Sequence, residues 1–142
     1  MKRKLRWGVL GCANIAIKSV IPAIQSSRTS ELIAIASRNI EKAKKTADET
    51  GIERAYGSYE ELLEDRDVDA VYIPLPNHLH MEWTVKAAQA GKHILCEKPL
   101  ALNQEQAERM IHACKKEGVQ LAEAFMYRHH PRYKRIKEIL ES

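Results

Sequence analysis

The sequence predicts an α/β domain built on a doubly wound parallel sheet of about six strands, in the order 3-2-1-4-5-6. Three observations support this fold class. Short apolar runs alternate with helical patterns along the chain, the runs are apolar on both faces, and each unusual motif follows the end of a run. In a doubly wound sheet those ends form one crevice, where ligands bind.

The predicted strands are the apolar runs themselves. "LRWGVLG" and "ELIAIAS" are the first two, and "VDAVYIPLP" is halted by Pro74 and Pro76, which cannot donate to a sheet ladder. "HILC" and "VQLAEAF" follow later in the chain. The predicted strands cover residues 5–11, 31–37, 54–56, 68–76, 93–96 and 119–125.

The predicted helices carry start and stop signals. Ser58 and Glu61 form a capping box, and Asn103 is a helix cap. Gly51 is suited to end the second helix, and Pro22 predicts a kink in the first. The last helix, "RYKRIKEILE", is amphipathic. The predicted helices cover residues 14–27, 40–50, 58–64, 78–90, 103–118 and 132–141.

The composition indicates one soluble globular domain. A chain of 142 residues can bury a core, and 44% hydrophobic residues argue against disorder. No apolar run approaches the ~20 residues that cross a bilayer, so no membrane partner is expected. Three cysteines without paired spacing indicate a reducing, cytoplasmic environment. A net charge of +4 without zinc-finger spacing favours a phosphorylated small molecule over a nucleic acid.

A variant of the G-x-G-x-x-G/A phosphate fingerprint, "GCANIA", follows the first strand. Gly11 permits the tight turn, and Ala13 stands where the second glycine lets the backbone approach a pyrophosphate. The helix that follows presents free amides to phosphate oxygens. The alternative is a turn of small residues that only packs tightly. The residues expected to bind a dinucleotide here are Gly11, Cys12, Ala13, Asn14 and Ile15.

The end of the second strand predicts which dinucleotide binds. Counting twenty residues from the first glycine selects Glu31, but that residue begins the strand, roughly 20 Å from the crevice at ~3.3 Å per residue. Arg38 stands at the correct end, and a guanidinium fits a ribose 2′-phosphate. The alternative is a solvated surface arginine. We expect NADP(H) to be preferred over NAD(H), bound through Ser37, Arg38, Asn39 and Lys42.

Five motifs resemble those of one enzyme family in order and spacing: "GCANIA", "ASRN", "YIPLPNHLH", "CEKPLA" and "EAFMYRHHP". The family is that of glucose–fructose oxidoreductase, inositol 2-dehydrogenase and rhizopine catabolism (Gfo/Idh/MocA), and its dihydrodiol dehydrogenase and sugar oxidoreductase branch is the most similar. The resemblance implies a Rossmann fold over residues 1–124. Residues 125–142 would be a hinge and first helix leading to a substrate domain absent from this chain.

The resemblance implies further cofactor contacts. Glu97 would contact the nicotinamide ribose, and Arg128 would touch substrate or cofactor, although a basic residue at a domain boundary is an equal alternative. The residues that would line the ribose side of the cofactor are Pro74, Leu75, Pro76, Asn77 and His80.

The resemblance also gives Lys98 of "CEKPLA" a catalytic role, next to a Lys98–Pro99 peptide bond that is often cis in the family. Its ammonium would stabilise negative charge on a substrate oxygen as hydride arrives. The alternative is a surface lysine paired with Glu97. Since the family takes an acid/base group from the second domain, we expect this chain to bind cofactor with little turnover.

Other functions receive less support from the sequence. His78 and His80 lack further ligands for a metal site, so no metal is expected. The apolar side of residues 132–141 predicts self-association where a second domain does not cover it. Two classes stay open: the cofactor half of an oxidoreductase acting on a sugar, polyol or trans-dihydrodiol, and a non-catalytic dinucleotide-binding module.

Overall fold

The computed structural model describes residues 3–141; the ends of the two expected domain spans, residues 1–2 and 142, lie outside them. It contains a six-stranded sheet in the order β3-β2-β1-β4-β5-β6, with every neighbouring pair parallel. The predicted fold class and strand order are therefore confirmed. The strands are β1 Leu5–Leu10, β2 Ser30–Ala36, β3 Arg54–Tyr56, β4 Ala70–Ile73, β5 His93–Cys96 and β6 Leu121–Glu123.

β1 is one residue shorter than the sequence predicts, and β4 and β6 are shorter by several residues. β4 ends at Ile73 rather than residue 76 because Pro74 and Pro76 offer no N–H to the ladder. β6 is an edge strand and pairs only with Ile94–Cys96 of β5, so its ladder covers three residues instead of seven. The predicted span of 119–125 therefore included the loops at both ends of the strand.

The helices are η1 Ala16–Val20, α1 Ile21–Ser26, α2 Ile40–Thr50, α3 Tyr59–Glu64, η2 Asn77–Leu79, α4 His80–Gln89, α5 Gln104–Lys116, η3 Met126–His129 and α6 Pro131–Leu140. Asn39, Ser58 and Asn103 each accept a backbone N–H at a helix start, as cap residues do. In the capping box, the Glu61 carboxylate accepts the N–H of Gly57, one residue earlier than the usual pattern.

The helix predicted over residues 14–27, with a kink at Pro22, consists of sections of two helix types. Its middle section, η1, is a π-helix, and α1 follows with Pro22 in its first turn. Proline has no N–H to donate to the preceding turn, so the i→i+4 ladder is interrupted there. The interruption is accommodated as a wider turn before the proline.

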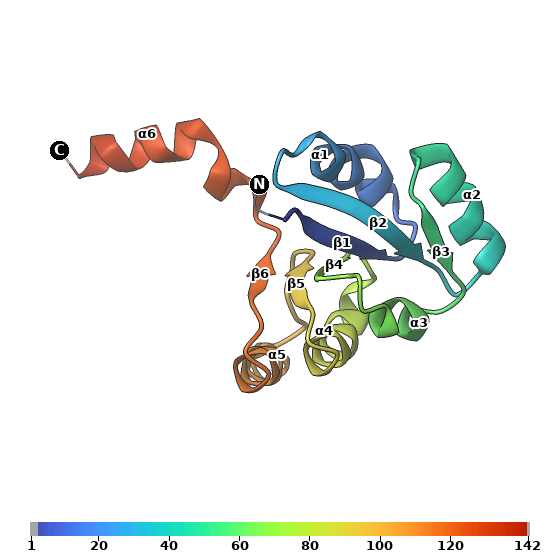
Figure 1. The fold of residues 1–142 in the computed structure, drawn as a ribbon. Coiled ribbons are helices and arrows are strands. Elements are labelled where there is room, and N and C mark those ends of the chain that lie inside the picture. The colour runs from blue at the N-terminus through green and yellow to red at the C-terminus, as the bar shows by residue number, and fades with distance from the viewer. Residues whose placement is uncertain (1–2, 142) are drawn as a thin grey trace.

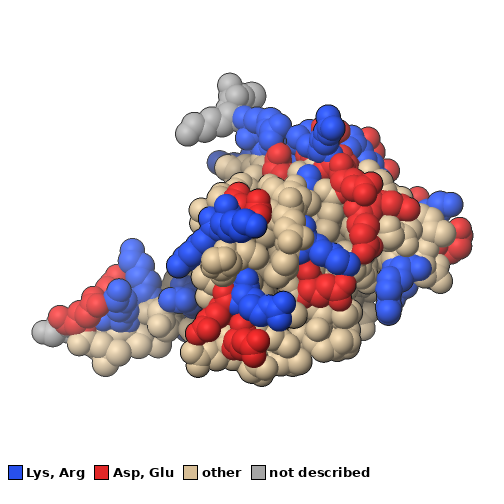
Figure 2. Space-filling model, turned by 90° about the horizontal axis from the view of Figure 1, so that it is seen from below, with Lys and Arg blue, Asp and Glu red and all other residues tan. Residues whose placement is uncertain are grey.

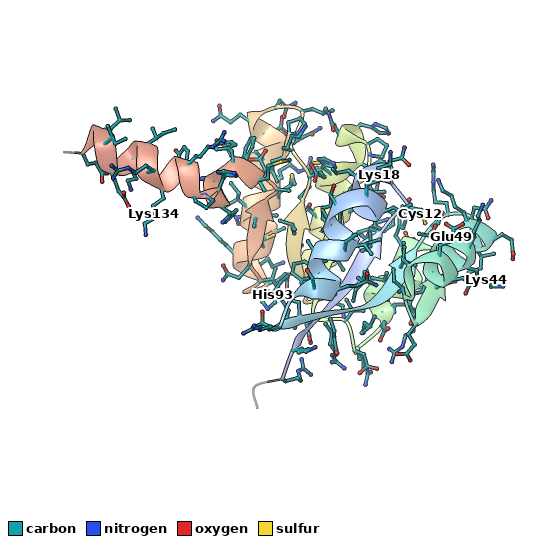
Figure 3. The ribbon with its side chains drawn as sticks, turned by 90° about the horizontal axis from the view of Figure 1, so that it is seen from above. Cys12, Lys18, Lys44, Glu49, His93 and Lys134 are labelled. Carbon is teal, nitrogen blue, oxygen red and sulfur yellow. The ribbon has the colours of Figure 1, made fainter. Side chains whose placement is uncertain are left out.

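Helices cover both faces of the sheet (Figure 1), with α1 and α2 on one face and α3, α4 and α5 on the other. The core on the first face includes Val9 and Ile35, and the core on the second includes Leu10 and Ile73, all fully buried. Strands that are apolar on both sides thus have a helical layer to pack against on each. α6 extends away from the sheet, and Lys134 marks it at a distance from the other helices (Figure 3).

Charged groups gather at the amino-terminal edge of the sheet. The ammonium of Lys92, which is 6% exposed, donates to the backbone carbonyls of Asp65 at 2.6 Å and Val68 at 2.8 Å. Burial lowers the pKa of Lys92, although the nearby carboxylates oppose this. Arg54 donates to the carboxylates of Asp65 and Asp67, both at 2.9 Å. This network joins β3 to the chain entering β4, opposite the crevice.

Asp65 makes the stability of the fold depend on pH. Burial alone would raise its pKa, but the N–H of Asp67, the guanidinium of Arg54 and the hydroxyl of Tyr56 lower it below the usual value. The pKa is thus lower in the folded chain, so its stabilisation is present above pH ~4 and is lost as pH falls through the folded value. Replacing Asp65 with Asn should reduce the free energy of unfolding at neutral pH by about 1–3 kcal/mol.

Denaturant unfolding followed by circular dichroism between pH 7 and pH 2 measures this effect. The Asp65→Asn protein should lose less stability on acidification than the unmodified chain. Asp48→Asn, an exposed position on α2, is the control and should leave the acid dependence unchanged. Parallel acid curves for Asp65→Asn and the unmodified chain would contradict the role assigned to this carboxylate.

Candidate cofactor site

A crevice of about 490 Å³ lies at the carboxyl ends of the central strands. The sequence-predicted residues after β1, β2 and β4 meet in it, although they are distant in sequence. It is lined by Gly11, Cys12, Ala13, Ser37, Arg38, Asn39, Lys42, Tyr59, Pro74, Leu75 and Pro76. The site of a doubly wound sheet is expected at this edge, where the strand order reverses between β1 and β4.

The turn after β1 is shaped by Gly11. Its φ of +108° is a conformation that side chains rarely adopt, and its N–H donates to the carbonyl of Ala36 at 2.8 Å. A Cβ at this position would lie 2.9 Å from Cδ2 of Leu75. The following residues Asn14 and Ile15 are exposed at the start of the first helix but do not line the crevice. The amides in the first turn of a helix lack partners within it.

Cys12 packs the turn against the neighbouring helix. Its Sγ lies 3.9 Å from the carbonyl oxygen of Lys42 on α2. Figure 3 shows Cys12 between the first helix and α2, and His93 at the start of β5 on the opposite edge of the sheet. The thiol is therefore a small packing group on the crevice wall.

The turn after β2 leaves two cations available. The Oγ of Ser37 accepts the N–H of Asn39 at 3.2 Å, and Oδ1 of Asn39 accepts the N–H of Lys42 at 3.2 Å. Both oxygens are thus used to start α2. The side chains of Arg38 and Lys42 are exposed and face the crevice that they line. Two cations next to the start of a helix, where Ser37 and Asn39 order the backbone, form a site that suits a phosphate.

Tyr59 is a crevice residue that the sequence analysis missed. Its ring packs edge-on against Trp83, with ring centroids 4.8 Å apart. Burial raises the pKa of the Tyr59 hydroxyl, and the nearby Arg38 guanidinium opposes that rise. The phenol therefore lies beside the proposed phosphate-binding arginine. Its position directly after the cap Ser58, at the carboxyl end of β3, was the available signal.

The residues of the loop after β4 that are expected to bind cofactor do not all lie at the crevice. Leu75 is 8% exposed and lines the crevice with its neighbouring prolines, and Asn77 is exposed at the start of η2. His80, in contrast, is fully buried and does not line the crevice, so the expected contact with the cofactor ribose stays a prediction without a crevice position to support it. Its ring is turned inward by the first turn of α4, where both ring nitrogens face backbone carbonyls.

The loop after β5 carries Glu97 and Lys98. Oε1 of Glu97 accepts the hydroxyl of buried Tyr72 at 2.7 Å, and Oε2 accepts the N–H of Lys98 at 3.1 Å. Burial, followed by this carboxylate, raises the pKa of Tyr72. The side chain of Lys98 is exposed, and none of the ion pairs of residues 3–141 joins its ammonium to Glu97. The alternative of a surface lysine paired with Glu97 is therefore not observed. The Lys98–Pro99 bond is cis.

A second, mainly apolar hollow of about 360 Å³ adjoins this loop. Glu97 and Ile15 line it together with Phe125, Met126 and His129 of the segment that leads to α6. Glu97 and Ile15 therefore belong to a neighbouring hollow rather than to the crevice. Arg128 is exposed on η3 and lines neither of these two hollows.

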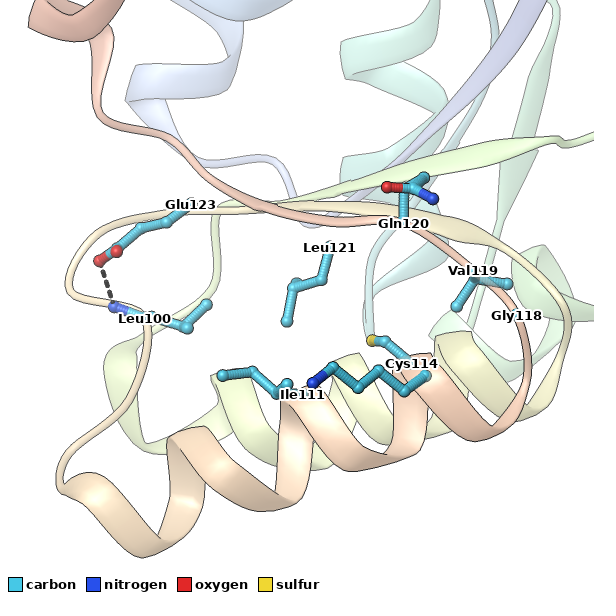
Figure 4. A pocket seen from close by; sticks show the side chains of 9 residues that line it. Leu100, Ile111, Cys114, Gly118, Val119, Gln120, Leu121 and Glu123 are labelled. Carbon is cyan, nitrogen blue, oxygen red and sulfur yellow. Dashed lines mark hydrogen bonds between the residues drawn. The ribbon is translucent and has the colours of Figure 1, made fainter.

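A third hollow, of about 490 Å³, lies between α5 and β6 (Figure 4). Leu100, Ile111 and Leu121 form part of its lining, and Glu123 accepts the N–H of Leu100 at 2.8 Å across it. None of the residues expected to bind cofactor line this hollow. Its relevance to the site is the hydrogen bond, which holds the end of the loop that carries Lys98.

Several expectations about other ligands can be compared with residues 3–141. No group of three or more His, Cys, Asp or Glu side chains there could hold a metal ion. No helix in this part of the chain has the length and apolarity to cross a membrane. On the face covered by α3 to α5, positive and negative side chains are interspersed (Figure 2), as where Lys86 pairs with Glu60 and Glu82.

Comparison with known proteins agrees with this geometry. The family model of oxidoreductases with an NAD-binding Rossmann fold (Gfo/Idh/MocA) matches residues 5–125. An uncharacterized oxidoreductase of Rhizobium meliloti is 49% identical over 97% of this chain and 41% of its own length. D-xylose 1-dehydrogenase (NADP(+)) 2 of Haloferax volcanii is 51% identical over 97% of this chain and 42% of its own.

Solved structures show the same relationship. A 3-ketoreductase from Actinomadura kijaniata, in complex with NADP, superposes with a TM-score of 0.92 and 44% identity over 98% of this chain and 44% of its own. The chain thus spans less than half the length of these relatives. Its fold, its motifs and these matches show that the chain belongs to the Gfo/Idh/MocA oxidoreductase family and contains that family's NAD-binding Rossmann domain.

Proposed function

We propose that this chain is the cofactor-binding part of an NADP(H)-dependent oxidoreductase that transfers hydride to or from a sugar, polyol or trans-dihydrodiol. The observation that carries the cofactor preference is the pair of exposed cations, Arg38 and Lys42, at the carboxyl end of β2. A 2′-phosphate would be neutralised there, whereas the free 2′-hydroxyl of NAD(H) would offer neither cation a negative charge. NAD(H) is therefore the weaker ligand.

Different residues of the chain would bind the cofactor and contact the substrate. The turn at Gly11 would hold the pyrophosphate with backbone amides, and Arg38 would hold the 2′-phosphate. When bound, the nicotinamide would supply or accept hydride. Lys98 would donate a hydrogen bond to the substrate oxygen and stabilise its charge, and Glu97, held by Tyr72, would orient the ribose next to it.

The names of the relatives support the substrate class. They include the xylose dehydrogenase, a dTDP-3,4-didehydro-2,6-dideoxy-alpha-D-glucose 3-reductase of Actinomadura kijaniata, and trans-1,2-dihydrobenzene-1,2-diol dehydrogenases of Xenopus. All act on carbons that carry oxygen, which fits a lysine placed to contact a carbonyl or hydroxyl. Substrate binding and the acid/base group are assigned to a second domain, which the relatives' greater length can accommodate.

The last segment is assigned to the connection with that domain. We place the boundary after residue 124, so that residues 125–142 are the hinge and first helix. On α6 the apolar side chains of Tyr133, Ile136 and Leu140 are exposed by 45%, 54% and 81%. The second domain would cover this face, and copies of the chain lacking it would self-associate. The three unpaired thiols favour a reducing, cytoplasmic location.

Calorimetric titration of the chain with NADP⁺ and NAD⁺ tests the proposal. We expect NADP⁺ to bind at least about tenfold more tightly, because hydrogen bonds between charged groups are worth about 1.5–3 kcal/mol each. The preference should diminish at high salt, since the contact is exposed. Equal affinities, or a preference for NAD⁺, would contradict the assigned cofactor, and binding of neither would contradict the site.

A further inference from the structure

His80 connects two loops at the cofactor edge of the sheet. It is fully buried at the start of α4, with Nε2 2.7 Å from the carbonyl oxygen of Leu75 and Nδ1 2.9 Å from that of Pro99. A carbonyl oxygen only accepts hydrogen bonds, so each ring nitrogen that carries a proton donates to the carbonyl it faces.

The two carbonyls belong to loops that follow neighbouring strands. Leu75 lies in the loop after β4 and lines the crevice, and Pro99 directly follows Lys98 in the loop after β5. The last backbone hydrogen bond between these strand ends runs from the N–H of Glu97 to the carbonyl of Ile73, at 3.1 Å. Beyond it the loops diverge, and the imidazole of His80 spans the gap between them.

We propose that His80 is a positioning residue that fixes the crevice wall at Leu75 relative to the lysine at position 98. The inference rests on the proposed function, since it assumes that cofactor binds between these loops. The far side of the second loop is already held, because the N–H of Leu100 donates to Glu123 at 2.8 Å (Figure 4). His80 supplies the corresponding restraint on the side facing the crevice.

A role in packing alone predicts a different result, and Thr84 provides the comparison. It lies one turn later on α4 and is also fully buried, but in residues 3–141 its hydroxyl bonds neither loop. The hydroxyl of Thr84 lies next to the thiol of Cys96 in β5, so Thr84→Ala changes the buried side of the same helix without removing a bond between the two loops. His80→Leu keeps most of the ring's volume and removes both bonds, and His80→Gln can restore one of them.

Two readouts separate positioning from stability. The first is amide hydrogen exchange in the absence of cofactor, at Leu79, whose N–H donates to the carbonyl of Pro76 next to the first loop, and at Leu100, whose N–H donates to Glu123 at the end of the second. The second is calorimetric affinity for NADP⁺ and for 2′,5′-ADP, a fragment that reaches the Arg38 end but lacks the nicotinamide half. We expect His80→Leu to raise both exchange rates at least about tenfold and to weaken NADP⁺ about tenfold.

In the same variant, 2′,5′-ADP affinity should stay within about threefold, and His80→Gln should recover part of the loss. Thr84→Ala should change neither the loop exchange nor the ratio of the two affinities. Unchanged exchange in His80→Leu, or equal losses for NADP⁺ and 2′,5′-ADP, would overturn the inference. Failure of the unmodified chain to bind NADP⁺ would instead overturn the proposed function, and the exchange rates would still decide whether His80 ties the loops.

Discussion

Replacing Arg38 with Ala should weaken NADP⁺ binding about 30- to 100-fold and leave NAD⁺ affinity within about threefold. The guanidinium is exposed at the carboxyl end of β2 and lines the crevice. The hydroxyl of Ser37 and the amide of Asn39 are uncharged, so neither can replace the positive charge of the guanidinium. The substitution would therefore remove a contact to the 2′-phosphate, a group that NAD⁺ lacks.

Parallel titrations with the two dinucleotides measure this difference. Arg38→Lys should recover part of the NADP⁺ affinity, because an ammonium supplies charge without the planar fork. Lys45→Ala is the matched control, since Lys45 is an exposed cation on α2, the helix that follows Arg38, and pairs with Glu49 at 3.8 Å. Equal losses of NADP⁺ and NAD⁺ in Arg38→Ala would exclude a contact to the 2′-phosphate.

Gly11→Ala should remove most cofactor binding and also lower the stability of the domain. The positive φ of +108° would cost about 1–3 kcal/mol with a side chain present. The new methyl would lie 2.9 Å from Leu75, so that the crevice wall must move. We expect the free energy of unfolding to fall by about 2–4 kcal/mol and NADP⁺ affinity to fall at least about 30-fold.

Gly118→Ala is the control that separates the cost of a positive φ from the effect of a new contact in the crevice wall. Gly118 also has a positive φ, of +68°, but an added Cβ there would meet nothing within 4 Å. It should lose about 1 kcal/mol of stability and bind NADP⁺ normally. Denaturant unfolding and calorimetry on both variants provide the comparison. Normal NADP⁺ affinity in Gly11→Ala would show that the turn does not approach the cofactor.

The topology could be predicted because the signals for it are local and repeated. Each apolar run is bounded by a cap, a glycine or a proline, and parallel strands with crossover helices leave few arrangements. Asn39, Ser58 and Asn103 cap their helices as the sequence indicates. Strand ends were less accurate, because the length of a ladder depends on its neighbour, as β6 shows.

The orientation of single side chains could not be obtained in the same way. His80 follows the change from η2 to α4, and this change of helix type turns its ring toward the core rather than the crevice. The sequence places Tyr59 only at a helix start, whereas packing on Trp83 places its ring in the crevice wall. Both positions depend on contacts between elements that are distant in sequence.

The separation of the charged network from the crevice has an evolutionary consequence. The bonds that Lys92 and Arg54 make lie at the amino-terminal edge, whereas Ser37, Arg38 and Asn39 lie at the other. If Arg38 binds the 2′-phosphate as proposed, exchange of the residue at position 38 should alter the choice of coenzyme and leave the interactions at the other edge intact. Proteins with this fold could then change between NADP(H) and NAD(H) during evolution by single substitutions at this edge of the sheet.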